Sequence, residues 1–231
     1  MPTKSPTEHT DHSGGSKGAT RKRVPRAVRE PQMLDAATEV FSERGFHAAS
    51  MDDIAAKVDV TKPMLYAYFG SKEGLYRAAV QRAGDHVVQM LTELMDMQDA
   101  RKRLKEGTDA LLTFFFSQRA AWTMVYNERM APEGLFDINV FRERVAEIAA
   151  RTLVEASKQE NGDGDTAVTE ADVRQALPYA VAMIGSCQGL LSWWTKHGDV
   201  DQTRCRSFSH ELVDSHLRCC MQALRAEAHP A

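Results

Sequence analysis

The amino-acid sequence predicts an all-α protein, with a small three-helix domain near the N-terminus and a larger helical domain after it. Apolar residues recur every three or four positions through most of the 231 residues, and no stretch shows the sustained two-residue alternation of a strand. Capping residues and glycines divide this pattern into about nine segments of helical length.

Residues 50–76 have the pattern of two short helices joined by a tight turn and followed by a longer helix. Ser50 and Asp53 have the spacing of a capping box, which predicts the start of the first helix. Asp59 ends this helix, since Asp tolerates a left-handed conformation better than most residues. Thr61 begins the second helix and Gly70 ends it. The stretch therefore predicts a helix-turn-helix.

Two such short helices cannot bury a core alone, so a supporting helix is needed. Residues 31–44 provide one, because Pro31 suits the first helical position and Gly45 suits a left-handed stop. An apolar stripe that includes Leu34 and Phe41 faces the pair. The three helices form one predicted domain, residues 31–76.

About 45 residues of this region carry a resemblance to a known family. The matching positions are Phe41, Arg44-Gly45-Phe46, Ser50, Asp53-Ile54-Ala55, Val60-Thr61-Lys62, Leu65-Tyr66-Ala67-Tyr68-Phe69 and Ser71-Lys72-Glu73-Gly74-Leu75. They resemble the N-terminal domain of the TetR family of bacterial transcriptional regulators. The chain departs from that family at Asp59, where the family usually has Gly.

The second helix of the pair is the predicted DNA-reading helix, because such a helix inserts its N-terminal residues into the major groove. Leu65 and Phe69 face inward, so the other side chains of this helix are available to DNA. The resemblance adds phosphate contacts by Ser50, Lys72 and one or both tyrosine hydroxyls; in the alternative interpretation the tyrosines only pack. The predicted DNA-binding residues are Ser50, Thr61, Lys62, Pro63, Met64, Tyr66, Ala67, Tyr68 and Lys72.

The charges are distributed unevenly along the chain. Residues 1–84 carry 13 Lys or Arg against 10 Asp or Glu, whereas residues 85–231 carry 16 against 22. Residues 1–30 are predicted to be a disordered arm that ends in a basic run, which either contacts DNA phosphates and the minor groove or serves as a solubilising tail. The basic residues of this run are Lys17, Arg21, Lys22, Arg23, Arg26 and Arg29.

Residues 77–231 form the predicted ligand-binding and dimerisation domain. Its expected helices cover 71–97, which joins the two domains, and 101–119, 120–130, 136–158, 169–196 and 201–225. The resemblance implies that the last two helices pair with those of a second copy as a four-helix bundle; a monomeric core is the alternative. The predicted interface residues are Ile184, Leu191, Phe208, Leu212, Leu217 and Cys220.

Aromatic and soft side chains are frequent in the second domain and suit an adaptable apolar cavity. The resemblance implies a pocket for an inducer between helices 101–158 and 169–196, and the composition predicts a lipophilic ligand. Ordinary core packing is the alternative for each residue. The candidates are Phe115, Trp122, Tyr126, Met130, Met183, Cys187 and Trp194.

Other functional classes receive little support. No grouping of nucleophile, acid and base residues predicts an enzyme, and no cofactor or metal site is expected. Cys219 and Cys220, with His216, leave open a redox or metal sensor. No apolar run predicts a membrane span or a secretory signal, so a cytoplasmic location is expected.

The sequence thus predicts a dimeric, ligand-responsive DNA-binding regulator, most simply a repressor released from a palindromic operator by a lipophilic small molecule. Three alternatives remain: a redox- or metal-sensing regulator on the same scaffold, a helical ligand-binding protein with a vestigial DNA-binding head, and an activator of transcription.

Overall fold

The computed structural model describes residues 25–126, 138–197 and 201–228. These residues form nine α-helices and one 3-10 turn, and none of them lies in a strand, which confirms the predicted fold class. The helices are α1 (Arg26–Ala48), α2 (Met51–Lys57), α3 (Lys62–Phe69), α4 (Lys72–Glu93), α5 (Ala100–Ser117), α6 (Arg119–Tyr126), α7 (Ile138–Asn161), α8 (Glu170–His197) and α9 (Gln202–Ala228), with the 3-10 turn η1 (Leu94–Asp96) after α4.

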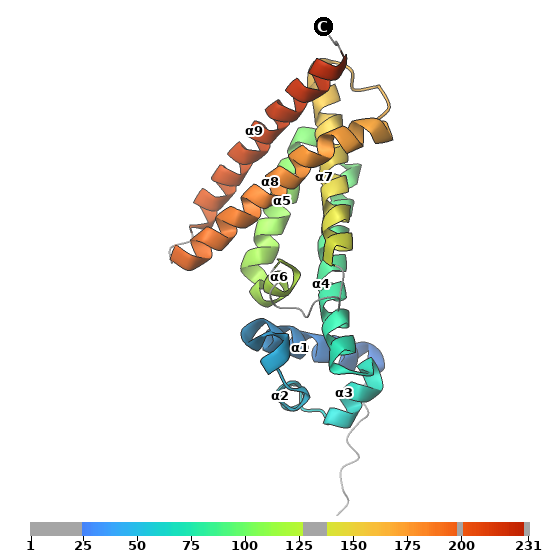
Figure 1. Ribbon diagram of the computed structural model, residues 1–231, viewed down its shortest axis with the longest axis vertical. Helices are drawn as coiled ribbons and strands as arrows, with labels where there is room; N and C mark the ends of the chain where they lie inside the picture. Colours follow the sequence, from blue (N-terminus) through green and yellow to red (C-terminus); the bar gives the residue numbers. More distant parts are fainter. Residues whose placement is uncertain (1–24, 127–137, 198–200, 229–231) are drawn as a thin grey trace, which may run out of the picture.

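The molecule is elongated, with a small group of helices at one end (Figure 1). We call α1, α2, α3 and the first turns of α4 the head, and α5 with α7, α8 and α9 the body. Helix α4 runs from the head into the body, and α6 lies where the two meet (Figure 1). Among the described residues no helix is long and apolar enough to cross a membrane.

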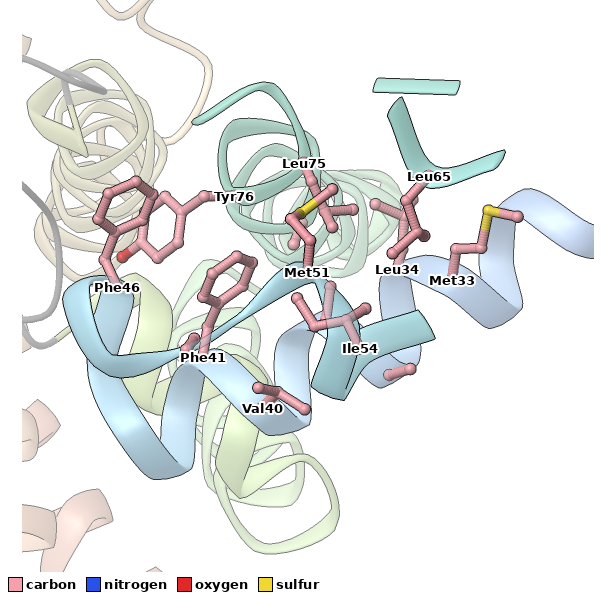
Figure 2. Close-up of a cluster of buried hydrophobic side chains, with 14 of the residues drawn as sticks. Met33, Leu34, Val40, Phe41, Phe46, Met51, Ile54, Leu65, Leu75 and Tyr76 are labelled. Carbon is pink, nitrogen blue, oxygen red and sulfur yellow. The ribbon is translucent and has the colours of Figure 1, made fainter. Parts of the chain in front are cut away.

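The head is built around one apolar core (Figure 2). Phe41 of α1, Ile54 of α2 and Leu65 of α3 are all completely buried in it. Tyr76 of α4 closes one side, with its ring centroid 5.1 Å from that of Phe41 and 5.4 Å from that of Phe46. Burial raises the pKa of Tyr76 to about 12. The inward side chains that the sequence pattern identified are therefore the ones that hold the three helices together.

Helix α1 begins earlier than the sequence predicted. It starts at Arg26, so Pro31 lies inside the helix, and residues 26–30 belong to α1 and not to the arm. The Arg26 guanidinium is 2.9 Å from the Glu30 carboxylate and lies over the Tyr68 ring, and these contacts stabilise the additional turn. Gly45 has a φ of 73° and a ψ of 168°, so the helical backbone predicted to end here is interrupted at Gly45, and α1 continues beyond this kink to Ala48.

Helix α6 contributes to the core of the head although it lies outside the predicted N-terminal domain, residues 31–76. Its Met124 is 1% exposed and packs in the same cluster as Phe41 and Phe46. This contact joins the head to a helix of the second predicted domain. A domain boundary at residue 76, as predicted from the sequence, leaves Met124 out of the core to which it belongs.

The body is held by two further apolar clusters. Leu153 and Val154 of α7 are completely buried near Ala176 of α8 and Leu217 of α9. Thr169 and Asp172 form a capping box: the Thr169 amide donates to the Asp172 carboxylate at 3.0 Å, and the Asp172 amide donates to the Thr169 hydroxyl at 3.2 Å. Its effect is to fix the start of α8, the helix that lines both the cavity and the outer face.

Candidate DNA-binding surface and ligand cavity

The helix-turn-helix has the local geometry that its sequence predicts. The Ser50 hydroxyl accepts a hydrogen bond from the Asp53 amide at 3.1 Å, and Asp53 also accepts from Arg44 at 2.6 Å. Asp59 has a φ of 51°, so it takes the left-handed conformation for which the family usually has Gly. Gly70 has a φ of 76° and ends α3. The turn that sets α3 against α2 is therefore formed despite the Asp.

Helix α3 presents most of the predicted DNA-binding residues at the surface. Thr61, Lys62, Pro63, Met64, Tyr66 and Ala67 are exposed. Leu65 lies completely buried beneath them and anchors the helix. Tyr68 is half-buried under Arg26, whose guanidinium carbon lies 4.9 Å from the ring centroid. The exposed face offers one cation, one phenol and several apolar groups to a partner.

Ser50, Lys62 and Lys72 are already engaged within the head. Ser50 caps α2, and the Lys62 ammonium is 2.8 Å from a carboxylate oxygen of Asp52. Hydrogen bonding to that carboxylate raises the pKa of Lys62. Lys72 donates to the His47 carbonyl at 3.3 Å and lies 4.7 Å from the centroid of the Phe46 ring. These contacts hold the side chains at fixed places on the surface.

The folded head has no net charge of its own. Residues 25–84 contain eight Lys or Arg and eight Asp or Glu, so the surplus of three positive charges in the first 84 residues comes from residues 1–24. Several cations of the head are paired with acids: Lys57 with Glu39 at 2.5 Å, Arg44 with Asp53 at 2.6 Å and Arg82 with Asp35 at 2.5 Å. The long-range attraction of this half for a polyanion therefore depends on the N-terminal segment.

A cavity of about 60 Å³ lies between α4, η1, α5, α6, α7 and α8. Its lining is mainly apolar and includes Leu91, Leu104, Leu111, Val145, Ile148 and Leu191. Trp122 and Tyr126 of α6 form one wall, with ring centroids 4.1 Å apart. Burial raises the pKa of Tyr126, whose hydroxyl shares a hydrogen bond with the Gln188 side chain. Such a lining suits an apolar ligand.

Arg103 is the charged residue in this lining, and its charge is neutralised by protein groups. It pairs with Glu155 of α7 and donates to the backbone carbonyl of Met97, with 3.0 Å between Nε and that oxygen. Its guanidinium thus ties α5 to α7 and to the segment after η1. We therefore assign it a structural function in the cavity wall.

The cavity contains four of the seven residues predicted for the ligand pocket. Trp122, Tyr126, Met183 and Cys187 line it. Phe115 and Trp194 pack in the surrounding apolar cluster but not in the lining, and Met130 lies outside the described residues. Sequence reasoning missed the aliphatic lining and Arg103, because periodicity places a side chain inside the body without distinguishing a cavity wall from close-packed core.

The predicted dimer interface needs correction. Leu191, Leu217 and Cys220 are buried within the single chain, so these three do not face outward, whereas Ile184 is half-buried and lines the cavity. The last helix carries two adjacent apolar stripes, and the structure turns the one containing Leu217 and Cys220 inward. Phe208 is exposed and Leu212 is half-exposed, so these two keep the position that an interface requires.

The outer face of the last two helices holds other exposed apolar groups. Val181 and Trp193 of α8 are exposed and lie on the same helix face as Gly185 and Gly189. In Figure 1, α8 and α9 run side by side along one edge of the molecule. This face, which we call the α8–α9 face, combines large apolar side chains with small residues that permit close backbone approach.

The four cysteines differ in burial. Burial raises the pKa of Cys187 and of Cys220 to about 11, which keeps these thiols protonated near neutral pH. Cys219 is exposed, although the adjacent Cys220 is buried. Within the described ranges, no three His, Cys, Asp or Glu side chains are grouped as metal ligands.

Comparison with known proteins decides the family. A crystal structure of a TetR-like transcriptional regulator from Rhodococcus sp. RHA1 is 33% identical and matches 85% of this chain and 99% of that chain, with a TM-score of 0.68. The chain belongs to the TetR family. The family model described as "Bacterial regulatory proteins, tetR family" matches residues 33–79, the part of the regulator that contains the helix-turn-helix.

Two curated relatives of the regulator match over shorter segments. The HTH-type transcriptional activator FasR of Mycolicibacterium smegmatis is 37% identical over 122 residues, which cover 52% of this chain and 55% of FasR. The biofilm operon regulator IcaR of Staphylococcus aureus, a negative regulator, is 32% identical over 85 residues, which cover 37% of this chain and 42% of IcaR. The chain thus spans about half the length of the curated relatives it matches.

A second solved structure shares the fold of the regulator. The regulator FadR of Bacillus subtilis, crystallised in complex with stearoyl-CoA, is 20% identical, covers 80% of this chain and 97% of its own, and has a TM-score of 0.62. At this identity the likeness concerns the fold alone.

Proposed function

We propose that this transcriptional regulator acts as a homodimer that reads a palindromic DNA operator with its two α3 helices. The exposed face of α3 carries the proposal, since its side chains extend from a helix fixed by Leu65 on a fully buried core. In a two-fold dimer the two helices enter successive major grooves about one helical turn apart. No catalytic step is part of this function, and the cytoplasm is its proposed location.

The α8–α9 face is the proposed dimer interface. Trp193 and Phe208 lie exposed on this face, and two copies of α8 and α9 together make a four-helix bundle. A Cβ atom added at Gly185 or Gly189, the exposed glycines of α8, would meet no other atom within 4 Å, which leaves room for a partner helix. Burial of these groups supplies the apolar contact on which a stable dimer depends.

A lipophilic small molecule is the proposed effector, and the cavity is its proposed site. The apolar lining suits an acyl chain, and FadR of Bacillus subtilis, which shares the fold, was crystallised in complex with stearoyl-CoA. The cavity volume of about 60 Å³ is far below the roughly 300 to 1,000 Å³ of sites that hold drug-sized ligands. A ligand of that size must therefore separate the helices that line the cavity.

Helix α6 is the proposed connection between the cavity and the head. Trp122 and Tyr126 line the cavity, while Met124 of the same short helix is buried in the core of the head. A ligand that displaces the two aromatic rings therefore also displaces an anchor of the head. In the proposed dimer, the ligand-bound conformation has a wider cavity and a different spacing between its two heads, so it no longer fits the operator. The ligand shifts the population towards this conformation because it binds it more tightly than the operator-bound one.

Repression is the proposed direction of control, with release from the operator by the effector. Activation is the second candidate, because FasR, identical at 37% of the matched positions, is named an activator. The two differ in where the operator lies relative to the promoter. Mapping the operator upstream of the promoter or across it distinguishes them.

The first experiment is selection of binding sites from random duplex DNA with the purified full-length protein. We expect a palindrome whose half-sites lie about one DNA turn or slightly more apart. Stearoyl-CoA and free stearate are then added to the complex, and release at micromolar concentration supports the cavity proposal. If no sequence is enriched with or without these ligands, the proposed DNA-reading function is wrong.

A further inference from the structure

We propose that Asp52 and Lys62 act as one unit that reads a G·C base pair in each operator half-site. Asp52 lies in the first turn of α2, and Lys62 is the first residue of α3. Their side chains meet across the turn, with 2.8 Å between the ammonium nitrogen and a carboxylate oxygen. This inference rests on the proposed insertion of α3 into the major groove, and it makes Asp52 a specificity-determining residue.

The pair is poorly explained by the stability of the head. Both side chains are exposed, at 44% for Lys62 and 70% for Asp52, and ion pairs in water add little to folding. Lys62 also stands at the N-terminus of α3, where the helix dipole disfavours a cation, and the first turn of α3 contains no acidic residue to offset this. A contact outside the chain accounts better for the presence of Lys62 here.

Asp52 is also unfavourable on a surface that approaches phosphates. Its carboxylate repels a polyanion and cancels the charge that Lys62 would otherwise bring to the DNA backbone. The pair is therefore net neutral, which removes attraction that is independent of sequence. The pair still presents the hydrogen-bond donors of the Lys62 ammonium beside the acceptors of the Asp52 carboxylate, at a fixed separation.

This arrangement matches the major-groove edge of a G·C pair. Guanine presents N7 and O6 as acceptors, and cytosine presents its N4 amino group as a donor directly beside O6. Guanine O6 and cytosine N4 are hydrogen-bonded to each other, so they are about 2.9 Å apart, close to the 2.8 Å between the Lys62 and Asp52 atoms. Lys62 can donate to N7 and O6 while Asp52 accepts from N4.

An A·T pair satisfies the same unit only in part, because thymine O4 and adenine N6 can meet Lys62 and Asp52 but offer Lys62 no second acceptor beside O4. Adenine N6 is a donor flanked by the acceptors N7 and thymine O4, and the thymine methyl group lies beyond O4. If Asp52 accepts from N6, its carboxylate lies beside the N7 acceptor, and Lys62 meets one acceptor and a methyl group. The neutral pair therefore favours G·C by its hydrogen-bond pattern and adds little affinity for other sequences.

The test compares the full-length wild type with Asp52→Ala, Lys62→Ala and the double variant on the selected operator. Asp35→Ala is the matched control: Asp35 is 67% exposed and pairs with Arg82 at 2.5 Å in the head, but this pair joins α1 to α4, away from α3. Binding is measured by fluorescence anisotropy over a range of salt, with each G·C pair of a half-site replaced in turn by A·T.

For the wild type, one such replacement in a single half-site should weaken binding roughly 5- to 150-fold. Asp52→Ala should reduce that penalty and strengthen binding to random DNA, with a salt slope about two units steeper for a dimer with two freed lysines. Lys62→Ala should lose the same base preference, and the double variant should lose nothing further at that position. Asp35→Ala should keep the wild-type base preference.

Two results overturn the inference while the proposed function stands. One is a selected operator without a G·C pair in the half-site, and the other is an Asp52→Ala protein with the wild-type base penalties and the salt slope of Asp35→Ala. Thermal unfolding of each variant shows that the head is folded. If the wild type itself enriches no sequence, the proposed function fails first and the inference falls with it.

Discussion

Replacing Met124 by alanine removes the side chain through which α6 enters the core of the head. Met124 is 1% exposed and belongs to the same buried cluster as Phe41, Phe46 and Tyr76. Deletion of a buried methionine side chain lowers the free energy of unfolding by about 2 to 5 kcal/mol, because apolar contacts are lost and a cavity remains. A domain the size of the head has a total stability of only several kcal/mol, so the head should be the part that unfolds first.

Urea unfolding followed by circular dichroism measures this effect. With a urea dependence of about 2 kcal/mol per molar, the midpoint for the head should fall by roughly 1 to 2.5 M. Met124→Leu is the control, since a swap that conserves volume lowers the free energy of unfolding by less than about 1.5 kcal/mol. Equal midpoints for Met124→Ala and Met124→Leu would refute the assignment of Met124 to the head core. Met124→Ala should also respond less to an effector, because α6 then has a weaker hold on the head.

Three further outcomes are expected. Substitution of residues 21–23 by Gln should lower the salt slope of DNA binding by up to about five units per dimer, since the folded head is neutral; an unchanged slope would show that this arm does not touch phosphates. Lys72→Ala should weaken binding to all sequences and lower the slope by about one unit for each protomer, and an unchanged slope and affinity would contradict its phosphate contact. Trp193→Asp should raise the dimer dissociation constant by about 100-fold or more in sedimentation, because a charge is then buried in the α8–α9 face. Val140→Asp, which changes a 57% exposed residue of α7 outside that face, should leave the dimer intact.

The local elements of the head could be predicted from sequence because their signals are short-range. Ser50 caps α2, Asp59 takes a left-handed conformation, and Gly70 ends α3, each through interactions within a few residues. The limit of such signals is shown by α1, where Pro31 suggested a helix start although the helix begins at Arg26. The contact of Arg26 with the Tyr68 ring comes from a residue 42 positions away and has no local signal.

The candidate sites show the same division. The exposed face of α3 follows from the burial of Leu65, which the spacing of apolar residues reveals. The composition of the cavity wall could be predicted only in part, because Phe115 and Trp122 have equally apolar patterns, yet only Trp122 lines the cavity. Which residues leave a space between them depends on side-chain packing from five helices and a turn, and no single helix encodes it.

The sequence by itself determined the all-helical class, the helix-turn-helix and the family of this protein, because periodicity, caps and turn residues act locally. Only the tertiary structure decided which apolar stripe of α9 faces inward, since the stripes of Phe208 and of Leu217 are equivalent until α7 and α8 pack against one of them. It also decided that Met124 belongs to the head and that Lys62 meets Asp52, ten residues earlier. These are contacts between elements, and their free energy depends on how whole helices pack and not on the residues adjacent in the chain.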